Sequence, residues 1–189
     1  MPGSERVMAI LAETIALHER VKQGELGPVT TAAAAIIDAF RQDGRLLTFG
    51  NGGSAADAQH VAADLVGRFL RERPSLAAIA LTTDTSVLTS VANDYAFDRV
   101  FARQIEGLGE SGDVAIGITT SGGSKNVVEA LTMAKDRGLT TVAVTGRDGG
   151  DAGRIADVHL NVPDRSTARV QEVHRTLLHV ICELVEETL

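Results

Sequence analysis

The residues of this chain best suited to chemistry begin in a glycine-rich segment, residues 48–60, which reads TFGNGGSAADAQH. An apolar run leads into Gly52 and Gly53, and the hydroxyl of Ser54 follows at the expected start of a helix. Glycine lets the backbone turn tightly and approach a ligand, Ser54 can cap the helix, and the unpaired N–H groups of the first helical turn attract an anion. This first turn predicts a phosphate site.

A second turn, residues 117–126, has the same organisation and reads GITTSGGSKN. Its hydroxyls belong to Thr119, Thr120, Ser121 and Ser124. A turn of the chain requires glycine but not hydroxyls, so the pattern favours phosphate binding over turn geometry alone. The segment lacks the GK[ST] of the Walker motif, which argues against a nucleoside triphosphatase. Two such turns indicate a phosphorylated metabolite.

Four further polar residues could form a metal site. His60 and Asp64 lie four residues apart in an expected helix, so both project from one face and can share an ion. Gln171 and His179 lie eight residues apart on one broad face of the last expected helix. An exposed His–Asp contact, a hydrogen-bonded interface amide and a core histidine explain the same residues, and the residue types alone leave these alternatives open.

The remaining polar candidates carry less information. Asn93 and Asp94, between two expected helices, suit a turn or cap and could also offer polar groups to a ligand. His174 shares the last helix but points away from the face of His179. His18 and His159 have no partner pattern, and we interpret them as structural.

These residues must be positioned by alternating strands and helices. Short apolar runs predict strands at 46–49, 78–81, 114–118, 141–144 and 158–162. Helical patterns cover 5–22, 29–41, 54–70, 85–92, 98–108, 124–137 and 166–187. Largely apolar strands separated by helices indicate a five-stranded parallel sheet covered on both faces, a doubly wound, flavodoxin-like α/β domain preceded by a helical pair. Ligands bind such sheets outside the carboxyl ends of the strands, where both turns lie.

Composition limits the class of protein. At 189 residues with 44% hydrophobic residues, the chain forms one domain with a sizeable core. A net charge of −7 and 3% aromatic residues argue against direct nucleic-acid binding. The single cysteine, Cys182, cannot form an internal disulfide, and we find neither a signal peptide nor a membrane span, so we expect a cytoplasmic protein.

The last helix is too apolar to be covered on one face only. Its apolar residues are Val170, Val173, Leu177, Leu178, Val180, Ile181, Leu184 and Val185. We expect such a helix to be buried on more than one side, and a closed symmetric oligomer would bury it in this way. The alternative is that the helix is buried entirely within its own subunit. We therefore divide the single domain into residues 1–44, helices used in oligomerisation, and residues 45–189, the α/β core with the last helix.

Six motifs follow one another along nearly the whole chain: GNGGSAADAQH, ERP-x6-LTTDTS, ANDYAFDRVFARQ, TSGGSKNV, VTGRDGG and RVQEVH-x4-H. In this order they resemble the phosphoheptose isomerases, members of the sugar isomerase (SIS) domain superfamily. The resemblance implies conversion of sedoheptulose 7-phosphate into D-glycero-D-manno-heptose 7-phosphate. It also implies a cytoplasmic homotetramer with active sites at subunit boundaries and a zinc ion in each subunit.

By position, the resemblance assigns a role to each candidate residue. The residues implied to contact the substrate are Asn51, Gly52, Gly53, Ser54, Asp64, Asn93, Asp94 and Gln171. The residues implied to bind its phosphate are Thr119, Thr120, Ser121 and Ser124. The residues implied to bind the metal are His60, Asp64, Gln171 and His179. Our hypothesis is that Asp64 and His179 are the catalytic base and acid of an aldose–ketose isomerisation through an enediol.

The chain departs from the family pattern at two positions. Family enzymes usually carry glutamate at the position of Asp64, and aspartate is shorter by one carbon–carbon bond, about 1.5 Å. Gly123 stands where asparagine is common, and the hydroxyls around it remain. Two alternatives stay open: a non-catalytic paralogue that binds the bacterial replication initiator, and an isomerase of another ketose phosphate.

Overall fold

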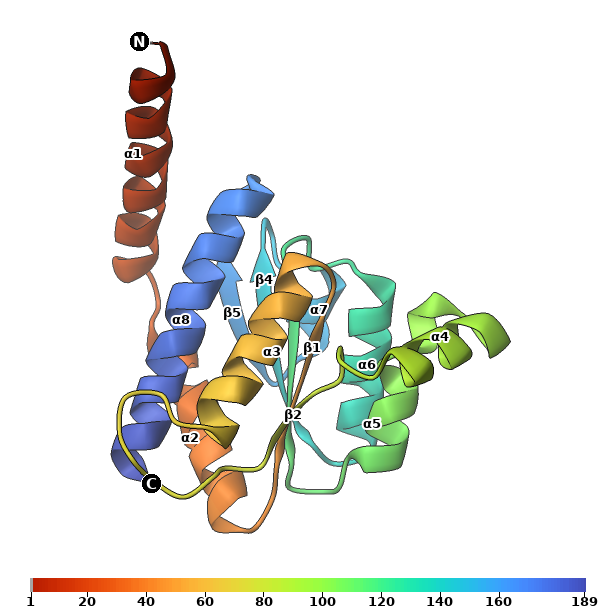
Figure 1. Ribbon diagram of the computed structural model, residues 1–189. Coiled ribbons are helices and arrows are strands. Elements are labelled where there is room, and N and C mark those ends of the chain that lie inside the picture. The colour runs from red at the N-terminus through yellow and green to blue at the C-terminus, as the bar shows by residue number, and fades with distance from the viewer. Residues whose placement is uncertain (1) are drawn as a thin grey trace.

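The computed structural model describes residues 2–189 and places a parallel sheet between two layers of helices (Figure 1). The strands are β1 (Leu46–Gly50), β2 (Ala78–Ala80), β3 (Val114–Thr119), β4 (Thr140–Gly146) and β5 (Val158–Val162). The helices are α1 (Pro2–Lys22), α2 (Gly27–Arg41), α3 (Gly53–Val66), α4 (Thr85–Asp94), α5 (Ala102–Leu108), α6 (Lys125–Asp136), α7 (Gly150–Ile155) and α8 (Thr167–Thr188), with a 3-10 turn at Phe97–Arg99.

All neighbouring strands pair in parallel, in the order β2-β1-β3-β4-β5. This is the flavodoxin-like order, whose switch point lies between β1 and β3. The two glycine-rich turns follow these two strands. The predicted doubly wound fold is therefore confirmed, and its topology brings both turns to one edge of the sheet.

The sheet separates two hydrophobic cores because side chains alternate between the faces of each strand. Leu46, Val114 and Ile116 pack against α2, α3 and α8 on one face. Leu47, Phe49 and Ala115 pack against α5, α6 and α7 on the other. The strands are buried on both faces, which explains their continuous apolar sequence and fixes the helices that carry the site.

Several predicted boundaries were wrong. Apolar periodicity extends to residue 70, but α3 ends at Val66 because Gly67 follows and the Arg73 side chain binds the last carbonyls of the helix. Ser54 does not cap α3, since Gly52 is the N-cap and Ser54 lies buried inside the first turn. The segment from 98 to 108 is divided into the 3-10 turn and α5, and α7 was missed because its six residues are too few for a periodic signal.

Helix α1 packs along α8, and its N-terminal half projects beyond the body of the domain (Figure 1). Apolar side chains stay exposed on this helix: Val7, Met8, Leu11 and Ile15. Within residues 2–189, no helix combines the length and the hydropathy that crossing a bilayer demands.

Candidate functional site

A cavity of about 300 Å³ lies where the two turns meet the start of α8. The lining includes eight predicted site residues: Asn51, Gly52, Gly53, Ser54, Thr119, Thr120, Ser124 and Gln171. Ile118 and Thr167 complete it, and no charged side chain contributes. Sequence reasoning missed Thr167, although its place at the start of a helix beside the sheet edge could have pointed to it. We call this space the hydroxyl cavity.

The hydroxyls of the second turn are linked to one another. Thr119 Oγ1 lies 3.0 Å from Ser124 Oγ and 3.3 Å from Ser121 Oγ. Ser121 Oγ also accepts a hydrogen bond from the Gly123 N–H at 3.2 Å, and Ser121 does not line the cavity. The arrangement of hydroxyls beside the start of α6 suits a phosphate group, with Ser121 shaping the turn behind the lining.

A pair of amides joins the two turns. Each side-chain amide of Asn51 and Asn126 donates to the carbonyl oxygen of the other, both at 2.9 Å, and Asn126 is buried. Because both amides are satisfied by one another, their orientations are fixed and the spacing of the two turns is set. Asn126 carried no signal in the sequence, since nothing in its spacing connects it with Asn51.

Three of the four predicted metal residues, His60, Asp64 and His179, converge in the structure. Their ligand atoms all lie within 4.8 Å of one another. The two Nε2 atoms are 2.9 Å apart, and Asp64 Oδ2 lies 3.4 Å from His60 Nε2. Asp64 Oδ2 is buried without a hydrogen bond, so a polar atom is left for a further partner. Two imidazoles and a carboxylate fit zinc, and the shorter side chain of Asp64 still reaches the cluster.

The environment of Asp64 also affects its acidity. Burial raises the pKa of this carboxyl, and Glu186 adds to the rise, while His60, His179 and Arg73 act in the opposite direction. The net pKa lies above the usual range of aspartate. A carboxylate with a raised pKa is a stronger base, which is the property that proton abstraction requires.

A second cavity, of about 570 Å³, shares Gly53 and Gln171 with the hydroxyl cavity. Its lining includes His18, Asp57, Glu172, Arg175 and His179. The two cavities therefore adjoin at Gly53 and Gln171, and we call them together the track, with hydroxyls at one end and the imidazole of His179 at the other. A larger cavity of about 690 Å³, lined by residues 147–148 and 163–165, contains none of the predicted site residues.

Most of the residues that line the second cavity were not assigned to a site by sequence reasoning. Buried Asp57 Oδ1 accepts hydrogen bonds from Arg175 Nε at 2.9 Å and Nη2 at 2.6 Å. His18 Nδ1 lies 2.9 Å from the Thr14 carbonyl, so α1 provides part of the cavity wall. The signal for Arg175 was its position midway between Gln171 and His179 on one helix face.

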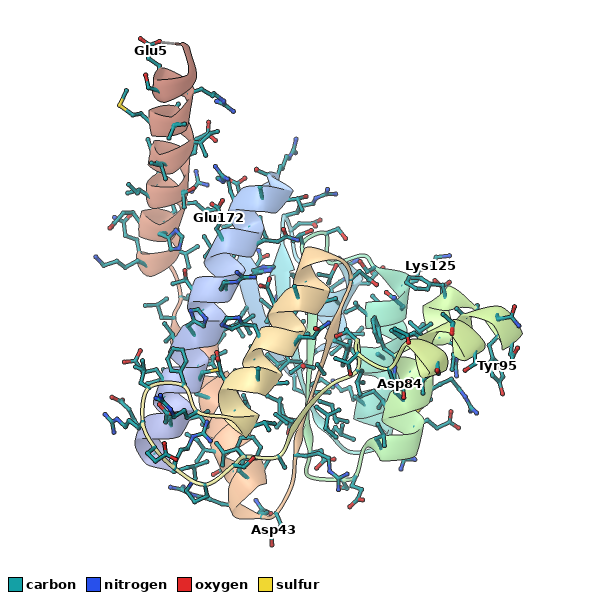
Figure 2. The ribbon with its side chains drawn as sticks, viewed as in Figure 1. Glu5, Asp43, Asp84, Tyr95, Lys125 and Glu172 are labelled. Atoms are coloured by element: carbon teal, nitrogen blue, oxygen red, sulfur yellow. The ribbon has the colours of Figure 1, made fainter. Side chains whose placement is uncertain are left out.

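Asn93 and Asp94 are not brought to these cavities. They end α4, and Asn93 Nδ2 donates to Asp94 Oδ1 at 2.7 Å. Figure 2 shows Tyr95, the next residue, at the far end of α4, on the opposite side of the molecule from α8. Any ligand that these two side chains contact lies away from the cavities of their own subunit.

The other histidines have separate partners. His159 Nε2 lies 2.7 Å from Thr145 Oγ1, and burial lowers its pKa. His174 is buried, with Nε2 at 2.8 Å from the Thr145 carbonyl, and it does not share the face of His179. Neither ring lies in the metal set.

A flavodoxin-like sheet with hydroxyl-rich turns at its switch point is typical of phosphate-binding α/β proteins. The family model of the SIS domain matches residues 11–146. A phosphoheptose isomerase of Geobacter sp. (strain M21) is 53% identical over 168 residues, 88% of each chain. One from Neisseria meningitidis serogroup A is 49% identical over 188 residues, 98% of this chain and 95% of the relative. The chain belongs to the phosphoheptose isomerase family of SIS-domain proteins.

Solved structures of two family members have the same fold. The phosphoheptose isomerase of Neisseria gonorrhoeae superposes with a TM-score of 0.92 at 46% identity, covering 97% of this chain and 98% of that one. The phosphoheptose isomerase of Francisella tularensis gives a TM-score of 0.94 at 33% identity, covering 99% of this chain and all of that one. The predicted family and fold are confirmed.

Proposed function

We propose that the protein is an enzyme that converts sedoheptulose 7-phosphate into D-glycero-D-manno-heptose 7-phosphate. The observation that carries this proposal is the track formed by the two cavities, with hydroxyls at one end and His179 at the other. An isomerase of a ketose phosphate needs a group of residues that binds the phosphate and another that transfers protons beside the carbonyl, and the two ends of the track can supply them. The family of the relatives supports the same reaction.

The phosphate binds to Thr119, Thr120 and Ser124 at the start of α6, and this binding energy lies far from the reacting carbons. The Asp64 carboxylate removes a proton from C1 of the ketose, which leaves an enediolate across C1 and C2. His179 delivers a proton to C2, and the proton of the C1 hydroxyl passes to the C2 oxygen, which completes the C1 aldehyde and the C2 hydroxyl. Gln171, which lines both cavities, contacts the substrate between the two ends.

We propose that His60, Asp64, Gln171 and His179 hold one zinc ion in each subunit. When bound, zinc supplies positive charge that stabilises oxygens that become negative during the reaction. The unpaired Asp64 oxygen and the close approach of the two Nε2 atoms support this assignment. Elemental analysis of protein purified without chelator tests it, and a metal-free protein with full activity contradicts it.

We further propose that the protein is a cytoplasmic homotetramer with its sites at subunit boundaries. The exposed apolar face of α1 supports oligomerisation, because an apolar helix face in water needs cover. Asn93 and Asp94 line neither cavity of their own subunit, which supports a role in a neighbouring subunit's site. The single, buried Cys182 is compatible with a reducing compartment.

The direct test follows product formation by NMR after the protein is mixed with sedoheptulose 7-phosphate. We expect heptose 7-phosphate from the wild-type protein and none from His179→Ala, whose circular dichroism and unfolding midpoint should stay close to the wild-type values. A wild-type protein that converts another ketose phosphate in a panel, but not this one, corrects the substrate. Absence of turnover with every substrate would favour the non-catalytic alternative, which the convergence of His60, Asp64 and His179 argues against.

A further inference from the structure

The Arg73 side chain binds the carboxyl end of α3, the helix that carries His60 and Asp64. Its Nη2 donates to the Asp64 carbonyl at 2.8 Å, and its Nη1 donates to the carbonyls of Leu65 at 2.8 Å and Pro74 at 2.9 Å. The last carbonyls of a helix have no partner within the helix, and a cation beside them is favourable. Only 6% of the Arg73 side chain is exposed. A buried guanidinium therefore hydrogen-bonds to the backbone carbonyl of Asp64 and restrains it.

The partner of Arg73 is Glu186 on α8. The Arg73 Nε atom lies 3.3 Å from Glu186 Oε1, and 2% of the Glu186 side chain is exposed. The carboxylate also accepts hydrogen bonds from the N–H groups of Phe69 at 2.9 Å, Leu70 at 2.6 Å and Arg71 at 2.8 Å. Burial raises the pKa of Glu186, but these N–H groups and Arg73 outweigh burial and keep it below the usual range. Glu186 is therefore an anion with a complete set of partners.

This ion pair connects both halves of the metal set. Arg73 holds the backbone of Asp64 on α3. Glu186 lies about two helical turns after His179 on α8, and it holds the N–H of Phe69, whose ring centroid is 5.4 Å from that of His179. The Asp64 Oδ2 atom makes no hydrogen bond, and its ion-pair contact is with His60 on the same helix, so the position of the carboxylate follows that of the α3 backbone.

We propose that Arg73 and Glu186 are positioning residues, whose buried ion pair sets the separation between Asp64 on α3 and His179 on α8. The inference rests on the metal site proposed above. Neither residue is a metal ligand or reaches the hydroxyl cavity. Groups that orient metal ligands from outside the ligand set typically change metal affinity by about 10- to 100-fold when they are replaced. A pair that only anchored the loop at 67–77 would change stability and leave metal affinity unaltered.

The test compares Glu186→Gln with Glu187→Gln. Glu187 is the next residue of α8 and pairs with Arg71 of the same loop at 3.3 Å, but 48% of its side chain is exposed. It is therefore a control of identical chemistry beside the proposed pair. Zinc affinity is measured by competition with a chromogenic chelator, and the ligand geometry by the visible absorption of the Co²⁺-substituted protein. All measurements are made well below the unfolding midpoint of each variant.

For Glu186→Gln we expect zinc affinity to fall by at least about tenfold, the Co²⁺ spectrum to change, and kcat to fall. The KM should stay within about twofold, because the hydroxyl cavity binds the phosphate and is unchanged. Glu187→Gln should behave as the wild type. Arg73→Lys is the second variant, since lysine keeps the charge but lacks the guanidinium fork that reaches three carbonyls.

Wild-type zinc affinity and an unchanged Co²⁺ spectrum in Glu186→Gln overturn the proposal even where its unfolding midpoint falls. If Glu186→Gln does not fold, Arg73→Lys decides by the same two readouts. A wild-type protein that neither binds zinc nor forms product contradicts the proposed function instead. An active wild type that binds zinc, with variants that match it in both readouts, contradicts the positioning role alone.

Discussion

Replacing Gly53 with alanine should disable the site without unfolding the protein. A Cβ atom at this position would lie 2.5 Å from Gln171 Nε2 and 2.9 Å from both Cδ and Oε1 of the same side chain. Heavy atoms in favourable contact are about 3.5–4.0 Å apart, so the Gln171 amide must move by about 1 Å. It can do so at little cost because it is the end of a flexible side chain. The backbone at Gly53 is helical, and alanine there stabilises by about 0.4–1 kcal/mol through the unfolded state.

A shift of about 1 Å at a positioned group costs on the order of a hundredfold in rate. We therefore expect Gly53→Ala to lower kcat/KM about 100-fold, or about 2.7 kcal/mol of transition-state stabilisation. The unfolding midpoint should move by no more than about 4 °C. Gly123→Ala in the second turn is the matched control, because a Cβ there meets no atom within 4 Å. Its kcat/KM should stay within about twofold of the wild type.

A double-mutant cycle with Gln171→Ala identifies the route of the effect. If alanine at 53 acts by displacing Gln171, adding Gly53→Ala to Gln171→Ala should cost almost nothing more, because the displaced amide is already absent. Losses that add in the double variant would refute this reasoning. Wild-type activity of Gly53→Ala itself would show that the position of Gln171 does not matter for the reaction.

Acid should destabilise the fold through His174, whose pKa is lowered chiefly by burial and whose Nδ1 is buried without a partner. The folded pKa lies below the ordinary value of 6.5, so this contribution to stability is complete above that pH and is lost as the pH falls below it. Urea midpoints should therefore fall less between about pH 7 and pH 5 in His174→Gln than in the wild type. Ile15→Glu on the exposed face of α1 should lower the mass measured by light scattering, and an unchanged mass argues against this face as a subunit contact. Chelation should lower the unfolding midpoint by several degrees and zinc should restore it, since a ligand at 100 times its Kd stabilises by about 2.7 kcal/mol.

The sequence predicted those features that depend on local pattern. Apolar runs predicted all five strands to within two residues at either end, because strands buried on both faces have continuous apolar sequence. The spacing of His60 and Asp64 predicted one helix face, and the two atoms lie 3.4 Å apart. The rule that ligands bind at strand carboxyl ends predicts that the two turns lie together, and residues of both turns line one cavity.

Contacts between residues distant in sequence were not predictable in this way. The Asn51–Asn126 amides and the Arg73–Glu186 ion pair connect positions with no common periodicity, so neither pattern nor propensity indicates them. The end of α3 was misplaced for the same reason: Arg73, seven residues beyond the helix, satisfies the carbonyls that a further turn would have bound. Polar pairs of this kind depend on how the sheet and helices pack in three dimensions.

The two long-range pairs lie near the two ends of the track, and in the proposed function one end binds the phosphate and the other moves protons. The Asn51–Asn126 amides fix the turns that line the hydroxyl cavity. The Arg73–Glu186 pair connects the loop after α3 with α8, and these two helices carry the metal set. The hydroxyl cavity has no charged side chain, so phosphate binding there depends on hydroxyls and on the helix start rather than on ion pairs. Helix α3 connects the two ends of the proposed mechanism, because it begins at Gly53 in the hydroxyl cavity and carries Asp64 in its last turn. From the proposed roles we expect a ketose phosphate with a shorter carbon chain to bind its phosphate yet leave its carbonyl short of Asp64 and His179.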